Sequence, residues 1–578
     1  MQGLHAKNEV PGTLRERRGF VPAMQNSTLV RFLVLLVPAC LARVSPAQTP
    51  WEGLTLFQPL SSTTTYLIDN SGAVFHSWSG TNEPGNSVYL LDNNELLRTL
   101  HLQGTVGGSG GGVQRVAWDG TLLWNFQYAT SAHLQHHDVA MLPNGNVLMI
   151  AWEYLTSAQA IAAGRNPAFL VGPTFAPDHI IEVQPSGSSG GTIVWEWHVW
   201  DHLIQDFDAS KANFGVVANH PELIDLNYPP QTVQQGDWNH VNSITYNETF
   251  DQILLSSHNQ NEIWVIDHST TSAEAAGHSG GNSGRGGDLL YRWGNPQAYD
   301  AGTAADKKLF GQHNAQWIDA GLPGAGDILV FNNGLNRPQG AFSTIEQITP
   351  AVDAQGNYAH TPGTAFGPAQ VSWNYTAAVP TSFYSSNISG TQRLANGNTL
   401  ICEGTTGLFF EVTAAGQTVW QYQNPFPTGA GSKRVFRCTR YRPCLTPESF
   451  CVTSPNSVGS GALMGWSGSV SHSANALVLA ISGAPNLKPG LFLFSPVATQ
   501  LPLSNGFLCV GPPVRRLPGV QTSGTGNAAY ALDFTNPTLS SSVISAGQTW
   551  RFQFWYRDPS MAPAGADLSN GLSVTFCN

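Results

Sequence analysis

At 578 residues the chain is too long for one ordinary domain, so its length predicts a large repeat architecture or two to four domains. Only 11% of the residues are charged, whereas 60 are glycine and 17 are tryptophan, which favours an all-β protein with many tight turns. The net charge of −11 comes without a basic run in the body of the chain. This excludes a nucleic-acid groove and leaves small molecules as the expected partners.

The N-terminal segment has the composition of a signal peptide. An apolar run at residues 32–42 follows a basic stretch and precedes a group of small residues. We expect residues 1–47 to be cleaved after Ala47, with a true start near Met24, because the first residues match no structural element. The apolar run is too short to span a bilayer. We therefore expect an exported protein without a membrane span, which is periplasmic, secreted or on the cell surface.

One sequence phrase recurs six times between residue 51 and about residue 440. A turn residue and a glycine are followed by apolar residues and a tryptophan, which is the signal of a hairpin that leads into an aromatic strand. The copies lie at residues 70–78, 119–124, 186–195, 286–293, 356–373 and 415–420. Self-similarity at such intervals predicts a propeller or solenoid of β units, and six copies predict six blades.

A second phrase places an Asn-Gly turn between two further strands of a unit. Residues 142–148 match residues 394–400, and residues 91–96 are a weaker match. Two hairpins per unit give four antiparallel strands, so we predict a six-bladed β-propeller at residues 48–441. Residues 434–441 are expected to return and complete the first blade, which would remove the open edge strands.

The pattern changes after residue 442, where short alternating strands replace the tryptophan phrase. We predict a small β-sandwich-like domain at residues 442–578, whose role the sequence leaves open. Six of the seven cysteines lie at residue 402 or later, and an even number in an exported chain favours disulfides over a metal site. Their pairing is left open among Cys402, Cys438, Cys444, Cys451, Cys509 and Cys577.

The inner strands of the predicted blades carry histidines at matching places. Counting back seven residues from the turn, with one irregular spacing, gives Asn86, His137, His240, His313 and Ser389. The first strand of each propeller blade lines the central channel, so we expect these positions to converge. A single such histidine is usually a satisfied half-buried side chain, but three at equivalent positions predict a functional cluster. His136 stays an alternative to His137, because a one-residue slip moves a strand side chain to the other face.

Four further polar residues complete the candidate site. Asn242 and His258 accompany these strands as candidate catalytic groups, and Asn333 and Arg337 are candidate substrate-binding residues. For Asn333, which precedes Gly334, a plain turn is the alternative interpretation.

Together these motifs resemble the arylsulfate sulfotransferase family. The residues that carry the resemblance are 136–138, 237–243, 311–313 and 328–334. It implies an exported six-bladed propeller, a transiently sulfated histidine, phenolic sulfate esters as donors and phenols as acceptors. By motif, His313 matches the sulfated histidine, while His240, Asn242 and His136 or His137 match the groups that bind the sulfuryl group.

The chain departs from the family at one place, where His258 stands for an arginine of the bacterial enzymes. The donor sulfate would lose a permanent bidentate cation and gain one that is charged only at lower pH, so we expect a pH optimum below neutrality. The cysteine pair near the family's active site also has no counterpart here. The natural donor and acceptor stay open.

The expected chemistry needs a nucleophile that is neutral at physiological pH, and an imidazole nitrogen meets this need without a cofactor or a metal. We therefore predict ping-pong transfer through His313, with the neighbouring histidines and Asn242 as hydrogen-bond donors. One alternative is a metal-dependent hydrolase or lyase built on His137, His240 and His313. A second is a non-catalytic exported scaffold, since propeller architecture fixes no function. The oligomeric state is not predicted.

Overall fold

The structure of the protein is a computed structural model that describes residues 49–577 except 230–235, 430, 443–446, 473, 537–542 and 546–547. The expected signal peptide and Cys444 lie outside the described residues. The described chain is all-β, as the composition predicts, and its α-helices α1 (Ser157–Ala162) and α2 (Ser272–Ala275) are short. Within the described part, no helix is both long and apolar enough to cross a membrane.

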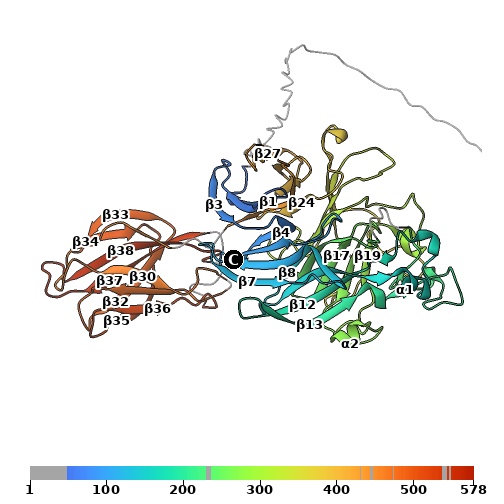
Figure 1. The fold of residues 1–578 in the computed structure, drawn as a ribbon. Coiled ribbons are helices and arrows are strands. Elements are labelled where there is room, and N and C mark those ends of the chain that lie inside the picture. Colours follow the sequence, from blue (N-terminus) through green and yellow to red (C-terminus); the bar gives the residue numbers. More distant parts are fainter. Residues whose placement is uncertain are drawn as a thin grey trace, which may run out of the picture. The chain divides into compact units, whose positions relative to one another are not determined.

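Residues 54–441 contain six four-stranded antiparallel sheets, whose strands Figure 1 labels. Named from the inner strand outward, the first three are β28 (Val435–Tyr441), β1 (Leu54–Pro59), β2 (Thr64–Ile68), β3 (Val74–Ser79); β4 (Pro84–Leu90), β5 (Leu96–His101), β6 (Gly111–Val116), β7 (Leu122–Gln127); and β8 (His133–Met141), β9 (Val147–Glu153), β12 (Asp178–Ser186), β13 (Gly190–His198). The next three are β16 (Val241–Asn247), β17 (Gln252–Ser257), β18 (Glu262–Asp267), β19 (Tyr291–Trp293); β20 (His313–Trp317), β21 (Ile328–Asn332), β22 (Thr344–Ile348), β23 (Trp373–Tyr375); and β24 (Gly390–Arg393), β25 (Thr399–Glu403), β26 (Leu408–Val412), β27 (Thr418–Gln423).

The inner strands of the six sheets close into a ring. β4 contacts β8, β8 contacts β16, β16 contacts β20, β20 contacts β24, β24 contacts β28, and β28 returns to β4. β28 comes from the end of this segment and pairs antiparallel with β1, so the expected return of residues 434–441 to the first sheet is observed. The result is a propeller-like ring in which the first strand of each sheet lines the axis.

A tryptophan from each sheet accounts for the repeated sequence phrase. Each indole N–H donates a hydrogen bond to the next sheet, and the last donates back to the first. The bonds run from Trp78 to Ala117 O (3.0 Å), Trp124 to Gly190 O (2.8 Å), Trp195 to Thr270 Oγ1 (3.1 Å), Trp293 to Pro368 O (2.9 Å), Trp373 to Ala414 O (2.8 Å) and Trp420 to Asn70 O (2.7 Å). Each indole packs between two sheets while its N–H is hydrogen-bonded. The repeated phrase therefore marks the contacts between neighbouring sheets.

Short elements decorate the connections between these strands. They are β10 (Leu155–Thr156), β11 (Thr174–Phe175), β14 (Leu203–Ile204) and β15 (Ile224–Asp225), with 3-10 turns η1 (Pro167–Phe169), η2 (Val199–Asp201), η3 (Val217–Asn219), η4 (Pro296–Tyr299) and η5 (Pro380–Ser382). Arg165 links the connection between β9 and β12 to the one between β13 and β16. Its buried guanidinium donates to the carbonyl of Leu226 and lies 5.5 Å from the ring of Phe175.

Among the described residues, the strands after residue 447 pair only with one another. They form a five-stranded sheet of β29 (Glu448–Phe450), β38 (Ala566–Thr575), β37 (Thr549–Arg557), β32 (Pro489–Ser495) and β35 (Arg515–Gln521), a three-stranded sheet of β30 (Leu463–Ser467), β31 (Val478–Ser482) and β36 (Ala528–Ala531), and the pair β33 (Ala498–Leu503) and β34 (Gly506–Val510). Leu479 and Phe492, from the two larger sheets, share one buried apolar cluster. A separate domain with a sandwich architecture stays a prediction.

The cysteines do not all form disulfides. Cys451 and Cys509 are bonded to each other, and Cys577 is also disulfide-bonded. Cys402 and Cys438 are free thiols in the apolar core between β25 and β28, where burial and a hydrogen bond to Cys438 raise the pKa of Cys402. The expectation of six bonded cysteines is therefore wrong for this pair, which fills the core as small apolar side chains do.

Candidate active site

Four imidazoles line one cavity at the axis of the ring. The cavity measures about 400 Å³, and His137, His240, His258 and His313 are among its lining residues. Centroids of neighbouring rings lie 4.5 Å apart from His137 to His240, 5.1 Å from there to His258, and 5.4 Å from His258 to His313. They come from β8, from the residues just before β16 and just after β17, and from the start of β20. Residues far apart in sequence therefore meet in space.

Left-handed backbone positions aim these side chains away from the regular strand direction. His137 (φ 50°) and His240 (φ 53°) have positive φ, and so has Asn314 (φ 53°), the residue after His313. The pairing of β8 with β9 and of β20 with β21 shifts register at these places. A bulge bends a strand and redirects a side chain, and positive φ is uncommon outside glycine. In β20 the residue with positive φ is Asn314, at the position that His137 and His240 occupy in their own sheets. His313 lies one residue before it, which explains why its spacing from the turn differs.

His313 is held as a neutral ring with one unprotonated nitrogen. Its Nδ1 lies 2.9 Å from Asn333 Oδ1 and 3.2 Å from the carbonyl of Gly311, so Nδ1 carries the hydrogen. Its Nε2 accepts a hydrogen bond of 3.2 Å from the backbone N–H of Ile388. Burial, together with the nearby His258, lowers the pKa of His313 well below its ordinary value. The Nε2 lone pair is therefore present at any pH near neutrality.

The backbone that faces His313 is strained. Ile388 (φ 50°) and Ser389 (φ 91°) both lie in the positive-φ region, which is an outlier for a β-branched residue. Such conformations cost on the order of 1–3 kcal/mol each and persist only where the surroundings impose them. Here the hydroxyl of Ser389 donates to Ser385 Oγ at 2.8 Å and accepts from the N–H of Gly404 at 3.0 Å. These bonds fix the amide of Ile388 against the imidazole.

His240 is paired with a buried carboxylate. Its Nδ1 is hydrogen-bonded to Asp237 Oδ2, and Asp237 Oδ1 accepts the indole N–H of Trp152 at 2.9 Å. Burial alone would lower the pKa of His240, but the carboxylate of Asp237 outweighs it and raises the pKa above its ordinary value. The pair therefore favours the protonated form of His240 beside the neutral rings of His258 and His137, and in that form Nε2 also carries a hydrogen.

A chain of contacts joins His137 to a buried carboxyl group. His137 Nδ1 lies 2.8 Å from His136 Nδ1, and His136 Nε2 lies 2.6 Å from Asp178 Oδ1. Burial raises the pKa of Asp178 and lowers the pKa of both histidines, which favours a neutral chain with the proton on the carboxyl. In a neutral chain His136 can donate its Nδ1 hydrogen to Nδ1 of His137. His137 then keeps its hydrogen on Nε2, as a donor for a group bound in the cavity.

His258 is neutral over the whole physiological range. Burial, together with the charge of His240, lowers the pKa of His258 to about 3, and its Nδ1 lies 2.9 Å from Asn259 Oδ1. The expectation that His258 becomes a cation in mild acid is therefore wrong, and this residue gives no reason for a pH optimum below neutrality. A buried imidazole next to an imidazolium does not take up a second positive charge.

Two of the expected catalytic residues lie behind the cavity wall. His136 is fully buried between His137 and Asp178, so the register places His137, and not His136, at the cavity. Asn242 is fully buried as well, and its Nδ2 donates to the backbone carbonyl of Gln312 at 2.8 Å. Neither side chain lines the cavity.

The two expected substrate-binding residues are also outside the cavity lining. Asn333 accepts from His313 and donates to two backbone carbonyls at 2.8 and 2.9 Å, so its amide orients the imidazole. The guanidinium of Arg337 lies 5.4 Å from the ring of Phe310 and 4.4 Å from that of Phe342, and donates to a threonine hydroxyl. The sequence does not reveal which face of a strand or turn such residues occupy.

Three residues at the site were missed in the sequence. Asp237 opens the motif that ends in His240, and Phe436 and Arg434 line the cavity from the start of β28. Arg434 is half-buried, its Nη2 donates to Asn387 Oδ1 at 3.2 Å, and within the described structure its buried Nε has no hydrogen-bond partner. Among the described lining residues it is the one with a permanent positive charge. The expected return of residues 434–441 was the signal that could have placed it here.

The histidines fit the three-histidine metal alternative poorly. Nδ1 of His240 is bonded to Asp237 and Nδ1 of His313 to Asn333, so each ring offers only Nε2. In the described part of the chain, the one group of three or more His, Cys, Asp or Glu side chains with ligand atoms within 4.8 Å of one another lies elsewhere. Zinc bonds of about 2 Å require ligands that converge more closely than these rings do.

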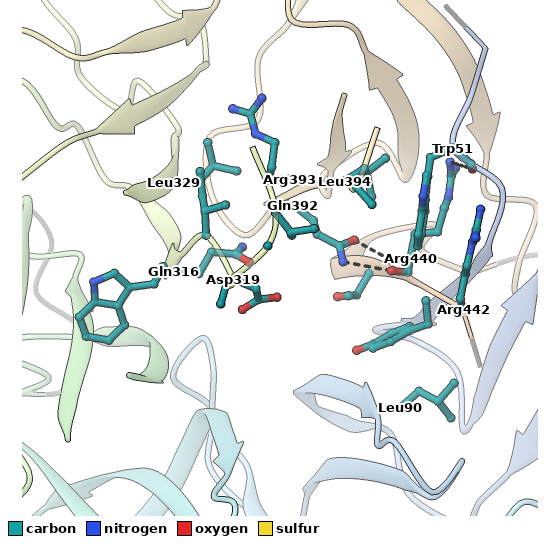
Figure 2. A pocket seen from close by; sticks show the side chains of 18 of the residues that line it. Trp51, Leu90, Gln316, Asp319, Leu329, Gln392, Arg393, Leu394, Arg440 and Arg442 are labelled. Carbon is teal, nitrogen blue, oxygen red and sulfur yellow. Dashed lines mark hydrogen bonds between the residues drawn. The ribbon is translucent and has the colours of Figure 1, made fainter. Parts of the chain in front are cut away.

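A larger cavity, of about 540 Å³, lies at the other end of the inner strands. Figure 2 shows its lining, which includes Gln316 from the end of β20, Asp319 and Gln392. The side chain of Gln392 bonds the backbone of Arg440 in both directions, at 3.0 Å from Nε2 to O and 2.8 Å from N to Oε1. None of the histidines lines it, so the smaller cavity is the candidate active site.

Comparison with known proteins gives a family for most of the chain. A family model described as Arylsulfotransferase (ASST) matches residues 47–426. No curated protein matches. Similar solved structures include a protein of unknown function from Bacteroides caccae (13% identity, TM-score 0.37, 68% of this chain and 99% of that one) and a periplasmic gluconolactonase from Pseudomonas aeruginosa (12%, 0.33, 64% and 96%). A streptogramin B lyase follows (12%, 0.32, 64% and 79%).

Proposed function

Because the chain belongs to the arylsulfotransferase family, we propose that its ring of sheets is a six-bladed propeller enzyme that moves a sulfuryl group from an aryl sulfate ester to a phenol. Family membership supports aryl sulfotransferase activity in general and implies aryl sulfates and phenols as substrates. The transfer takes place in the histidine cavity, through a sulfohistidine at His313. The enzyme is exported, a location that the disulfide between Cys451 and Cys509 supports.

The observation that carries this proposal is the state of His313. Its ring is neutral, Asn333 holds the hydrogen on Nδ1 at 2.9 Å, and Nε2 keeps a lone pair at a cavity wall. A nitrogen nucleophile must be unprotonated at the working pH, and this one needs no general base. The hydrogen bond that Nε2 accepts from Ile388 is long, at 3.2 Å, so an approaching sulfur can displace it.

In the first half-reaction Nε2 of His313 attacks the sulfur atom. The N–S bond forms, the S–O bond to the aryl group breaks, and the phenolate leaves with a proton from the imidazolium of His240. Asp237 supports this step because it raises the pKa of His240 and holds its Nδ1. The attack leaves positive charge on the His313 ring, which Asn333 Oδ1 stabilises by accepting the Nδ1 hydrogen.

The negative sulfuryl oxygens are met by two donors. Arg434 brings a guanidinium to the cavity, and His137 brings the Nε2 hydrogen that its contact with His136 directs. Charge-assisted hydrogen bonds of this kind are about twice as strong as neutral ones, and they act where charge develops. Arg434 thereby supplies the cation that His258 does not. The ring of Phe436, which also lines the cavity, offers an apolar surface to the aryl group.

The second half-reaction reverses the proton flow. The acceptor phenol gives its proton to the now neutral His240 and attacks the sulfur, the N–S bond breaks, and the new aryl sulfate ester leaves. His313 regains its lone pair and His240 its proton, so no external base or cofactor is consumed.

Steady-state kinetics with 4-nitrophenyl sulfate and phenol test this function. We expect nitrophenol release that depends on phenol, an equal amount of phenyl sulfate, and parallel lines in double-reciprocal plots. His313→Asn should abolish the transfer, whereas His360→Asn, at a half-buried histidine outside the cavity, should not change it. Intersecting lines would contradict the covalent intermediate. Nitrophenol release without phenyl sulfate would show a hydrolase instead.

A further inference from the structure

A second cluster of ligating side chains lies apart from the cavity. His202 follows η2, His278 follows α2, and Asp288 precedes β19, so three separate segments bring them together. Asp288 Oδ1 lies 2.9 Å from His202 Nδ1 and 2.7 Å from His278 Nδ1, and the three ligand atoms all lie within 4.8 Å of one another. None of the three lines the histidine cavity.

The hydrogen bonds of His202 place two hydrogen-bond acceptors face to face in this cluster. Its Nε2 lies 2.8 Å from the carbonyl oxygen of Ala275, which can only accept, so Nε2 carries a hydrogen. In the neutral ring Nδ1 is then a lone pair, and it faces a carboxylate oxygen of Asp288 at 2.9 Å. Two lone pairs at that separation repel each other. A proton on one of the two groups, or a bound cation, must lie between them.

The ring of His202 is held in an orientation that suits a metal ligand. The ring is fully buried and stacks on the indole of Trp197, with centroids 5.6 Å apart and planes 9° apart. A ring whose Nε2–H donates to a backbone carbonyl while Nδ1 is free has the tautomer that metal-binding histidines use.

We propose that His202 Nδ1, His278 Nδ1 and the carboxylate of Asp288 bind a zinc-class divalent metal ion. Two imidazoles and one carboxylate are a donor set that suits zinc, with water in the remaining position. Tetrahedral zinc with bonds of about 2 Å separates its ligands by about 3.3 Å, so the present spacings of 2.7 and 2.9 Å need to open only slightly. The side chain of His278 is 60% exposed, so it can shift and gives the ion a path from solvent.

The ion acts as a clamp between segments of the chain. It ties the insertion after β13 to the loop after α2 and to the start of β19. Because it lies outside the histidine cavity, it is independent of the proposed sulfuryl transfer. Metal binding to the folded state alone raises stability in proportion to the logarithm of metal concentration over the dissociation constant. The clamp should therefore appear in thermal unfolding and not in catalysis.

Zinc binding to the tag-free full chain tests this proposal. After treatment with a chelator and its removal, we expect one zinc equivalent by titration calorimetry and elemental analysis, with a rise in Tm. His278→Asn and Asp288→Asn should each weaken zinc binding by more than about 100-fold, since even loss of a group that only supports a ligand costs up to that much. His278 is exposed, so its replacement should leave the fold intact.

A matched control separates this site from adventitious binding. His220 and Glu222 form another surface histidine–carboxylate pair, at 2.9 Å, and His220→Asn should leave zinc binding unchanged. Failure of the wild-type chain to bind zinc would overturn the proposal. Zinc binding that survives in both His278→Asn and Asp288→Asn would overturn it as well, because it would place the ion elsewhere.

Discussion

Asp237→Asn tests the acid–base role of His240 without disturbing the surrounding scaffold. Asparagine has the same shape, and its side-chain oxygen can still accept the indole N–H of Trp152, which lies 2.9 Å from Asp237 Oδ1. What is lost is the negative charge next to His240 Nδ1. Since that charge is what raises the pKa of His240 against the effect of burial, the substitution should lower this pKa.

The size of the effect follows from the lost interaction. A hydrogen bond to a charged group contributes about 1.5–3 kcal/mol, and about 1.4 kcal/mol corresponds to a factor of ten in rate. The kcat/KM for phenyl sulfate in Asp237→Asn should therefore fall about 10- to 100-fold. 4-Nitrophenyl sulfate has a far less basic leaving group that departs without a proton, so its kcat/KM should fall much less.

The pH profile gives the second readout of the same variant. His240 is protonated below its raised pKa, so the wild-type rate with phenyl sulfate should hold from acid to neutral pH and fall as pH rises through that pKa. In Asp237→Asn the fall should begin at lower pH. Equal losses with both donors, or an unchanged profile, would refute the assignment of His240 as the general acid.

Three further outcomes are expected. Arg434→Met should raise KM for the aryl sulfate about 10-fold or more through loss of a charge-assisted bond, while Arg434→Lys should keep part of the affinity; equal KM values in all three proteins would exclude this contact. His258→Gln should leave the shape of the pH–rate profile between pH 5 and 8 unchanged, and a lost inflection would contradict its pKa of about 3. Reduction of the Cys451–Cys509 bond, which closes a loop of 58 residues, should lower the free energy of unfolding by roughly 4 kcal/mol in denaturant titrations, with transfer activity retained.

Much of the ring of sheets could be predicted because the residues that form the contacts between neighbouring sheets recur in the sequence. Each phrase ending in tryptophan marks a place where an indole packs between sheets and donates to the next one, as Trp78 does to Ala117. Asn-Gly turns mark the inner hairpins, and the return of residues 434–441 follows from the need to close the ring. The free thiols of Cys402 and Cys438 could not be predicted, since composition does not reveal which cysteines face the core.

The candidate site could be predicted only in part. Aligning the turns identified three of the four histidines that line the cavity, because equivalent inner strands converge on one axis. Alignment says nothing of bulges, however, so it could not choose between His136 and His137 or place Asn333 behind His313. Arg434 was missed because it reaches the cavity from the opposite end of the sequence, and the low pKa of His258 depends on burial that only the fold reveals.

The most direct test of the account is peptide mapping by mass spectrometry after brief exposure to 4-nitrophenyl sulfate without an acceptor. We expect one added sulfuryl group on the peptide that contains His313, its absence in His313→Asn, and its loss when phenol is added. Release of nitrophenol without any adduct, or an adduct on another residue such as His240, would contradict the assignment of His313 as the nucleophile.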